Sequence, residues 1–325
     1  MAKLLREEKG SVIILVAIGL VVFLGLTALV VDGGMVYVTR SNLQNAADAA
    51  ALAEVQEITK ALINRTTDSI DLAQAEIMVD KYGVLNGLKE ENIHAEEILL
   101  STNGKKIGIK VSATKNLGFL FGGVLGKSTG VVTAQAIAKT GVITGGTPVV
   151  PLSITYDPDR EPNTPAILET DTGQKGWYGL LRFPGYSGTS DLKALMWTGY
   201  EAPILLEELI PAEPGYTSVI KEIDKIYDKC VWDIHEDHPC TSLDYQKDCP
   251  RLVIVPAVTY ISGEGANTTV QVKSFALCLL DHSIDGKGKD PIHGTFIRGT
   301  VDGDFDSNLV GTSKDYGLYG YKLVK

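Results

Sequence analysis

Basic residues are scarce in this sequence, and they form no run. The chain has 30 Lys and Arg against 40 Asp and Glu, so its formal net charge is −10. Proteins that bind nucleic acid through its phosphates present clustered Lys and Arg side chains. The charge balance therefore excludes nucleic acid from the expected partners.

Charge is absent altogether from one stretch near the N-terminus. Residues 11–31 contain no charged side chain, and 15 of these 21 residues are Val, Ile, Leu or Phe. As a helix rising about 1.5 Å per residue, the stretch is about 31 Å long, which matches the hydrocarbon core of a bilayer. A buried core helix would carry polar side chains along one face, and only Ser11 and Thr27 are polar here. The sequence therefore predicts a transmembrane helix at residues 11–31.

A cleaved secretory signal is the main alternative to a retained membrane anchor. The apolar region of such a signal is usually only about 7–15 residues long and is followed by small residues at a cleavage site. Here the apolar run is longer, ends in Val30-Val31-Asp32, and continues into a helical pattern that cleavage would interrupt. We therefore expect the segment to be kept as an anchor.

The residues on either side of the span predict its orientation. Lys3, Arg6 and Lys9 precede it, whereas only Arg40 follows it closely. Basic residues concentrate on the cytoplasmic side of membrane helices. The sequence thus predicts a single-pass protein of the cell membrane, with a cytoplasmic N-terminus and an extracytoplasmic C-terminal domain.

The helical pattern continues beyond the span. Residues 41–63 contain neither Gly nor Pro, and they extend the span into one long helix, half in the membrane and half outside. Small residues recur at four-residue spacing in this second half, at Ala46, Ala47, Ala50 and Ala51. Such a stripe permits close helix packing. It fits either a face packed on the chain's own sheet or a contact between subunits.

Three motifs occur in order along residues 8–55. They are Lys9-Gly10-Ser11 before the span, Val31-Asp32-Gly33-Gly34 at its end, and Leu43-Gln44-Asn45-Ala46-Ala47-Asp48-Ala49-Ala50-Ala51-Leu52-Ala53 in the helix beyond. This region closely resembles the N-terminal region of TadE/TadG-like Flp pilus-assembly proteins. The resemblance implies a pilin-like, minor or assembly component of a Tad pilus system, with other pilin-like or Tad subunits and membrane lipid as partners. It also marks Asp32, Gln44 and Asp48 as motif residues of the helix.

The same resemblance implies a prepilin-like leader. Residues 1–10 would form this cytoplasmic leader, and a membrane prepilin peptidase would cleave the chain between Gly10 and Ser11. Major pilins carry Glu at the fifth position of the mature chain, and Leu15 occupies that position here. The departure favours a minor or assembly component over a major filament subunit.

An α+β fold is expected beyond the span. The 34 Gly and 13 Pro indicate many turns and a β-rich body. We expect a helical extension and small α/β platform at residues 32–143, followed by a β-rich extracytoplasmic domain at residues 148–325. The elements predicted in these parts are a helix at 71–82, paired strands at 107–113 and 132–138, and a hairpin of strands at 252–261 and 269–280.

Cysteine is rare, and all four Cys lie in the part of the chain expected outside the cytoplasm. Cys278 falls in an apolar strand and is expected to be a buried thiol. Cys230, Cys240 and Cys249 bracket a loop rich in acidic residues. Such a loop repels itself and buries little surface, so ordering it requires a covalent or metal tie. A disulfide persists outside the cytoplasm, and we expect one among these three residues, with the pairing left open.

A zinc site in the same loop is a weaker hypothesis. His235, His238 and Cys240 are zinc ligand types, and Cys249 follows them. Their spacing matches no standard zinc motif, and no helix is predicted there to set the geometry of the ligands. The disulfide is therefore the favoured tie.

A calcium site is the second weak metal hypothesis. Asp302, Asp304 and Asp306 alternate as the first ligands of a calcium loop do. The EF-hand pattern requires Gly at its sixth position and Glu at its twelfth, and Ser307 and Ser313 stand there instead. A solvated acidic turn is the favoured interpretation, and no cofactor is expected.

No catalytic motif in the sequence is complete. Gly126-Lys127-Ser128 ends like a phosphate-binding loop, but Phe121 stands where that motif has its first Gly. Gly185-Tyr186-Ser187-Gly188 differs from the Gly-x-Ser-x-Gly motif of serine hydrolases. We expect no nucleotide ligand, no catalytic residues and no enzymatic activity. The alternative left open is a membrane-anchored extracytoplasmic adhesin or metal-dependent enzyme.

Overall fold

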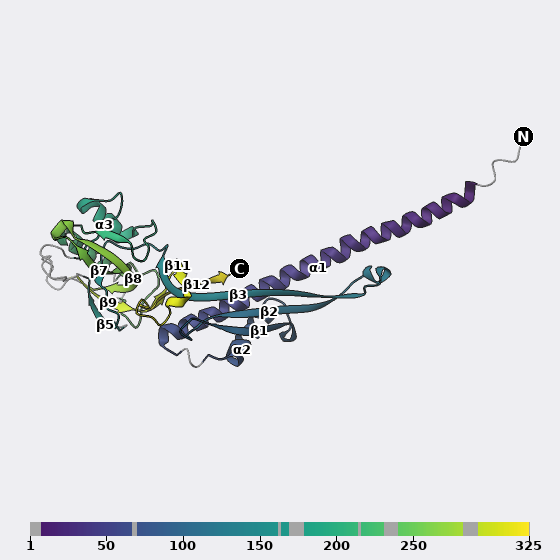
Figure 1. Ribbon diagram of the computed structural model, residues 1–325, viewed down its shortest axis with the longest axis horizontal. Helices are drawn as coiled ribbons and strands as arrows, with labels where there is room; N and C mark the ends of the chain where they lie inside the picture. Colours follow the sequence, from purple (N-terminus) through teal and green to yellow (C-terminus); the bar gives the residue numbers. More distant parts are fainter. Residues whose placement is uncertain are drawn as a thin grey trace, which may run out of the picture.

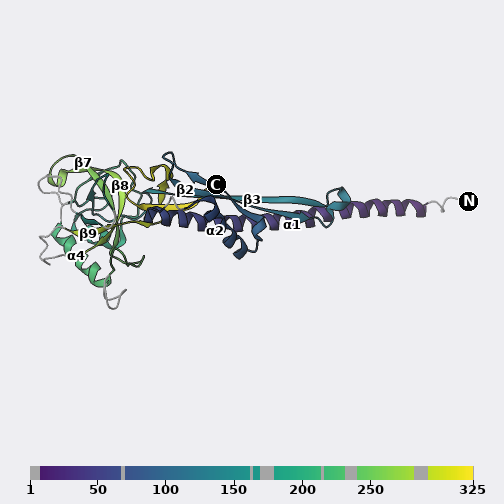
Figure 2. The same cartoon turned by 90° about the horizontal axis from the view of Figure 1, so that it is seen from below.

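The computed structural model describes residues 8–66, 70–161, 164–168, 179–213, 216–230, 240–281 and 292–324. The molecule is elongated (Figures 1 and 2). Helix α1 (Glu8–Asn64) protrudes at one end, and a head formed by the described part of residues 149–297 lies at the other end. A β-sheet runs along the second half of α1. The predicted class, α+β with a long N-terminal helix and a β-rich remainder, is confirmed.

Three further α-helices and four 3₁₀-helices occur among these residues. The α-helices are α2 (Leu72–Leu85), α3 (Gly188–Thr198) and α4 (Tyr216–Lys229). The 3₁₀-helices are η2 (Glu90–Asn92), η3 (Gly122–Leu125), η5 (Gly265–Asn267) and η6 (Ser307–Leu309). The helix predicted at 71–82 corresponds to α2, which runs on to Leu85. Asp71 caps its start, because the Asp71 carboxylate accepts a hydrogen bond from the Gln74 N–H at 2.9 Å.

The described strands form two six-stranded sheets. The first sheet contains β1 (Ile93–Leu100), β2 (Lys106–Gly118), β3 (Thr129–Gly145), β10 (Gly299–Thr300), β11 (Asp304–Asp306) and β12 (Leu318–Val324). The second sheet contains β4 (Ile154–Thr155), β5 (Thr164–Ile167), β6 (Leu209–Pro211), β7 (Leu252–Ser262), β8 (Thr269–Leu280) and β9 (His293–Ile297). The predicted pairing of strands around 107–113 and 132–138 is confirmed in β2 and β3, and the predicted hairpin is confirmed in β7 and β8.

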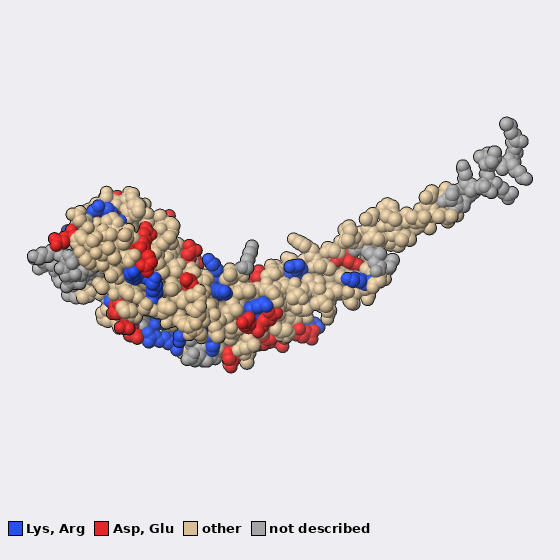
Figure 3. Space-filling model, in the orientation of Figure 1, with Lys and Arg blue, Asp and Glu red and all other residues tan. Residues whose placement is uncertain are grey.

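The first half of α1 is apolar and stands free of the rest of the chain. Leu15, Phe23 and Leu29 are each about 70% exposed, and no part of the most apolar 18-residue window is buried. On the face seen in Figure 3, the protruding part of the helix carries neither acidic nor basic side chains. This half is long and apolar enough to cross a membrane.

The second half of α1 packs on the first sheet. The small-residue stripe Ala46, Ala47, Ala50 and Ala51 is completely buried. It belongs to one hydrophobic core with apolar residues of α2, β2 and β3. Since Ala side chains extend little beyond the helix backbone, the sheet approaches α1 closely along this stripe. The stripe is therefore a face packed on the chain's own sheet, and it is not available for a contact between subunits.

Strand β3 is the centre of the first sheet. Along one edge it pairs with β2, with Ile109 opposite Ala138. Along the other edge it pairs with β12, with Tyr319 opposite Val142. The short strand β11 pairs with the last residues of β3, with Asp306 opposite Val142. The final strands of the chain thus complete a sheet that begins before the head.

This topology differs from a simple division of the chain at 144–148. A second domain is predicted at residues 148–325, yet β10, β11 and β12 lie in that range and pair within the first sheet. Ile143 and Leu318 of the first sheet also share a buried cluster with Phe275 and Leu277 of the second. Strand β2 leaves the last residues of one edge of β3 unpaired, and β11 pairs there, whereas β12 pairs along the other edge.

The head is built around the β7–β8 hairpin. Strands β4 and β7 pair in parallel, and β9 pairs with β8 antiparallel. Helices α3 and α4 contribute Leu192, Met196, Val219, Ile223 and Ile226 to a core shared with this sheet. The head is therefore a sheet with helices packed on it, and it lies at the end of the molecule opposite the apolar half of α1 (Figure 1).

Candidate functional site

The most specific polar contact of α1 lies at the end of its apolar half. Asp32 is 7% exposed, and it faces the tip of the β2–β3 hairpin (residues 119–128). Its Oδ1 atom accepts a hydrogen bond from the Leu120 N–H at 2.9 Å. Its Oδ2 atom accepts bonds from the N–H groups of Phe121 and Gly122, at 3.1 and 2.7 Å. We call this contact the Asp32 clasp.

The shape of the hairpin tip explains why it binds a carboxylate. Three successive N–H groups converge at the start of η3, which forms an anion-binding concavity. Glycine is required to build it. A Cβ atom on Gly122 would meet the Lys127 carbonyl oxygen at 2.5 Å, and one on Gly130 would meet the Phe119 ring at 2.7 Å. The Gly-rich insert between the two strands is thus shaped to hold Asp32.

The clasp fixes the position of the tip along α1. A groove of about 320 Å³ beside it is lined by Leu29, Val36, Phe119 and Lys127, among others. The adjacent Leu120 is 70% exposed. The tip therefore lies level with the end of the apolar half of α1, and it presents both an apolar and a basic side chain there.

The other two motif residues of α1 form a second contact with this hairpin, which Gln44 makes and Asp48 supports. The Gln44 Nε2 atom donates to Asp48 Oδ1 at 2.8 Å and to the Gln135 carbonyl oxygen in β3 at 2.9 Å. Asp48 thus orients the amide that joins α1 to β3. Asp32, Gln44 and Asp48 together hold the hairpin on α1, at its tip and along its length.

The predicted cleavage site lies at the start of the described chain. Gly10 and Ser11 belong to the first turns of α1. In the sequence, the bond between them lies where the apolar run begins.

A buried acid on the packed face of α1 was not predicted from the sequence. Glu54 is 3% exposed. Burial raises the pKa of its carboxyl from 4.5 to about 7, and the nearby Glu57 adds to the effect. The available signal was its spacing, since Glu54 follows Ala50 by four residues and therefore lies on the alanine stripe.

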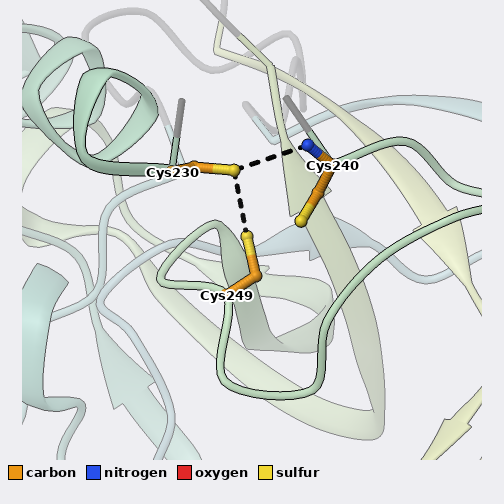
Figure 4. A group of neighbouring side chains, drawn as sticks. All are labelled: Cys230, Cys240 and Cys249. Atoms are coloured by element: carbon orange, nitrogen blue, oxygen red, sulfur yellow. Dashed lines mark hydrogen bonds between the residues drawn. The ribbon is translucent and has the colours of Figure 1, made fainter. Parts of the chain in front are cut away.

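Three cysteines meet in the head (Figure 4). Cys230 follows α4, Cys240 lies in the next described loop and Cys249 precedes β7. The Sγ atoms of Cys230 and Cys249 are 3.4 Å apart, and all three Sγ atoms lie within 4.8 Å of one another. They are free thiols. The structure therefore brings together the three residues predicted to share a disulfide, without forming that bond.

A buried arginine lies against this cluster. The Arg251 Nη1 atom lies 4.0 Å from Cys230 Sγ, and its guanidinium lies over the Tyr227 ring at 4.4 Å. Burial by itself would raise the pKa of the Cys230 thiol. The Cys240 N–H, the Cys249 thiol and Arg251 favour the thiolate, and the net effect lowers that pKa. Burial raises the pKa of Cys249. Cys230 therefore ionises more readily than Cys249.

The remaining sequence candidates are dispersed or lie outside the described residues. His235 and His238 lie outside the described residues. Asp304 and Asp306 are exposed in β11 and Asp302 is exposed just before it. Within the described part of the chain, their carboxylates do not converge as the three cysteines do. Cys278 is a fully buried thiol in β8, and burial raises its pKa to about 12.

Comparison with known proteins finds a family similarity in the N-terminal segment of the chain. Residues 10–55 match the family model described as putative Flp pilus-assembly TadE/G-like. This confirms the resemblance of the N-terminal region to proteins that take part in Tad pilus assembly. The matched segment contains Asp32, Gln44 and Asp48, and the head lies outside it. No curated protein and no solved structure matches the chain.

Proposed function

We propose that this protein is a membrane-anchored minor or assembly subunit of a Tad-type pilus system. One observation carries the proposal. The family match at residues 10–55 coincides with α1, whose first half is exposed and whose second half is buried on the sheet. The exposed half is free to contact lipid or neighbouring pilin-like helices. The buried half packs on the first sheet, and this sheet joins it to the head.

Anchoring in the membrane is supported by the chemistry of the first half of α1. Each Val, Ile, Leu or Phe near the centre of a span favours insertion by about 0.3–0.6 kcal/mol, so the exposed set contributes several kcal/mol. Lys3, Arg6 and Lys9 precede the span, which favours a cytoplasmic N-terminus. In this orientation the Asp32 clasp, the first sheet and the head all lie outside the cytoplasm.

A minor or assembly role is supported by the residue at position 15. Leu15 is exposed on the apolar half of α1 and carries no charge. It therefore offers no acid at the position where major pilins have Glu. The role proposed is structural and includes no catalytic step.

The proposal is tested in cells by processing and by pilus formation. Gly10→Val is expected to block cleavage before Ser11, so that intact-mass measurement finds the leader retained. Pili sheared from the surface should then decrease, as they should in a strain that lacks the chain. Gly19→Val is the control within the same helix, because a Cβ atom on Gly19 meets no atom within 4 Å.

Two results would contradict this proposal. Undiminished pili in the strain that lacks the chain would remove the pilus role. A mature chain that still begins at residue 1 or 2 would remove the cleavage and leave a simple signal anchor.

A further inference from the structure

Three buried sulfur atoms form one cluster in the head. The side chains of Cys230, Cys240 and Cys249 are at most 3% exposed. They come from three separate places: the end of α4, the loop beyond it and the turn before β7. In Figure 4 their sulfur atoms point toward a common centre. All three lie within 4.8 Å of one another, so one atom placed among them can contact all three.

The spacing of the sulfur atoms fits the ligands of one metal ion better than it fits a disulfide. Cys230 Sγ and Cys249 Sγ are 3.4 Å apart, whereas disulfide sulfur atoms are about 2.05 Å apart. Two thiolates held tetrahedrally at about 2.3 Å from one zinc ion are about 3.8 Å apart. A disulfide would also use two of the sulfur atoms and leave the third as a buried thiol.

The charge around the cluster supports the same conclusion. Arg251 is 3% exposed. Its position is fixed by hydrogen bonds from Nε to the Leu280 carbonyl oxygen at 2.6 Å and from Nη1 to the Cys240 carbonyl oxygen at 2.8 Å. Three thiolates and one divalent cation leave a single negative charge, which the guanidinium balances. A disulfide is neutral. With a disulfide, the acidic partner of Arg251 would be Asp281, whose Oδ1 atom lies 3.4 Å from Arg251 Nη2.

We propose that Cys230, Cys240 and Cys249 bind one divalent cation of the zinc class through three thiolates. Thiolates select soft and borderline ions such as Zn²⁺ over Mg²⁺ or Ca²⁺. Each bound thiol gives its proton to solvent, so uptake of the ion strengthens as pH rises. Among the described residues, no fourth His, Cys, Asp or Glu joins this group. A water molecule or another ligand would complete the coordination.

The ion joins three parts of the head that are separate in sequence. It links the end of α4 to the start of the β7–β8 hairpin through the acid-rich loop between them. This gives the loop the tie that its composition requires, by a metal in place of a disulfide. The site is independent of the proposed pilus role.

The test uses the full-length chain purified in detergent, with no reductant or metal added. We expect one zinc ion per chain by elemental analysis. After chelation and reduction, added Co²⁺ should produce the visible absorption of tetrahedral cobalt and a sulfur-to-metal charge-transfer band. Cys230→Ser and Cys249→Ser should lose both signals. Cys278→Ala should keep them, because Cys278 lies outside the cluster.

The wild-type chain alone can overturn the proposal, whether or not the serine variants fold. An intact mass that shows a disulfide between two of the three cysteines, in the chain as purified, would do so. So would a Co²⁺ spectrum without a charge-transfer band. If Cys230→Ser retained the zinc of the wild type, the metal would lie elsewhere and the proposal would be wrong.

Discussion

Asp32 uses two carboxylate oxygens to accept three backbone hydrogen bonds, so its removal leaves three donors unpaired. Asp32→Ala is expected to release the hairpin tip from α1 while the head stays folded. A hydrogen bond to a charged group contributes about 1.5–3 kcal/mol. Amide hydrogen exchange at residues 119–126, measured by mass spectrometry, should therefore accelerate by about tenfold or more.

Two further variants make this measurement specific. Asp32→Asn keeps one oxygen acceptor and should give intermediate exchange. Asp302→Ala removes an exposed acid near the opposite end of β3 and should leave the tip unchanged. If exchange at the tip were the same in Asp32→Ala as in the wild type, the clasp would not hold the hairpin.

Glu54 makes the stability of the packed half of α1 depend on pH. Its carboxyl pKa is raised from 4.5 to about 7 by burial, so the folded chain binds this proton more tightly than the unfolded chain does. The contribution of Glu54 to the free energy of unfolding is therefore greatest below pH 4.5, and it is lost as pH rises through 7. The loss amounts to about 3 kcal/mol at most.

Glu54→Gln should remove this part of the pH dependence. Urea unfolding of the full chain in detergent at pH 5 and pH 8 measures it. The variant should unfold at a higher urea concentration than the wild type at pH 8, and the gap should shrink at pH 5. Glu91→Gln changes a glutamate that is 72% exposed and should leave the profile unaltered. A wild-type profile in Glu54→Gln would contradict the assignment.

Strand β3 depends on a glycine where the C-terminal strands meet it. A Cβ atom on Gly141 would lie 2.6 Å from backbone atoms of Asp306 and Ser307. Gly141→Ala is therefore expected to push β11 and η6 away and to lower the free energy of unfolding by about 1–3 kcal/mol. Gly118→Ala, in β2, meets no atom within 4 Å and is the control. Equal unfolding midpoints for the two variants would show that β11 and η6 accommodate a Cβ atom at position 141 without loss of stability.

The elements with a strong local pattern were predictable from the sequence. The uncharged run fixed the first half of α1, and alternation fixed β2, β3 and the β7–β8 hairpin. The pairing of β12 with β3 was not predictable. Nothing in the residues of β12 indicates a partner strand that precedes the whole head in the sequence. The same reason applies to β11, which has only three residues.

The candidate sites were predictable in part. The family motif named Asp32 and Gln44, but their partners are backbone N–H and C=O groups, which leave no signature in the sequence. The acid-rich loop pointed to Cys230, Cys240 and Cys249 as neighbours. It gave no indication of Arg251, which reaches the cluster from the start of the hairpin and gives it a fixed positive charge.

At the scale of the whole molecule, the proposed orientation makes one direct prediction. In the Gly10→Val variant, which is expected to keep its leader, protease added to spheroplasts should digest the head, while a tag at the N-terminus stays protected until the cells are lysed. The reason is that the basic residues before the span stay in the cytoplasm. A digested tag with an intact head would reverse the orientation.

The pairing of β12 with β3 makes one edge of β3 depend on the last described strand of the chain. In the proposed orientation, the second half of α1 and the β2–β3 hairpin reach the outside before the C-terminal strands do. One edge of β3 therefore waits, with unpaired N–H and C=O groups, until Leu318–Val324 has crossed the membrane. Such an edge readily pairs with another chain. A chain that stalls late in translocation would thus expose an unpaired strand edge outside the cell. Pairing of β12 with β3 removes this edge and prevents β3 from pairing with another chain.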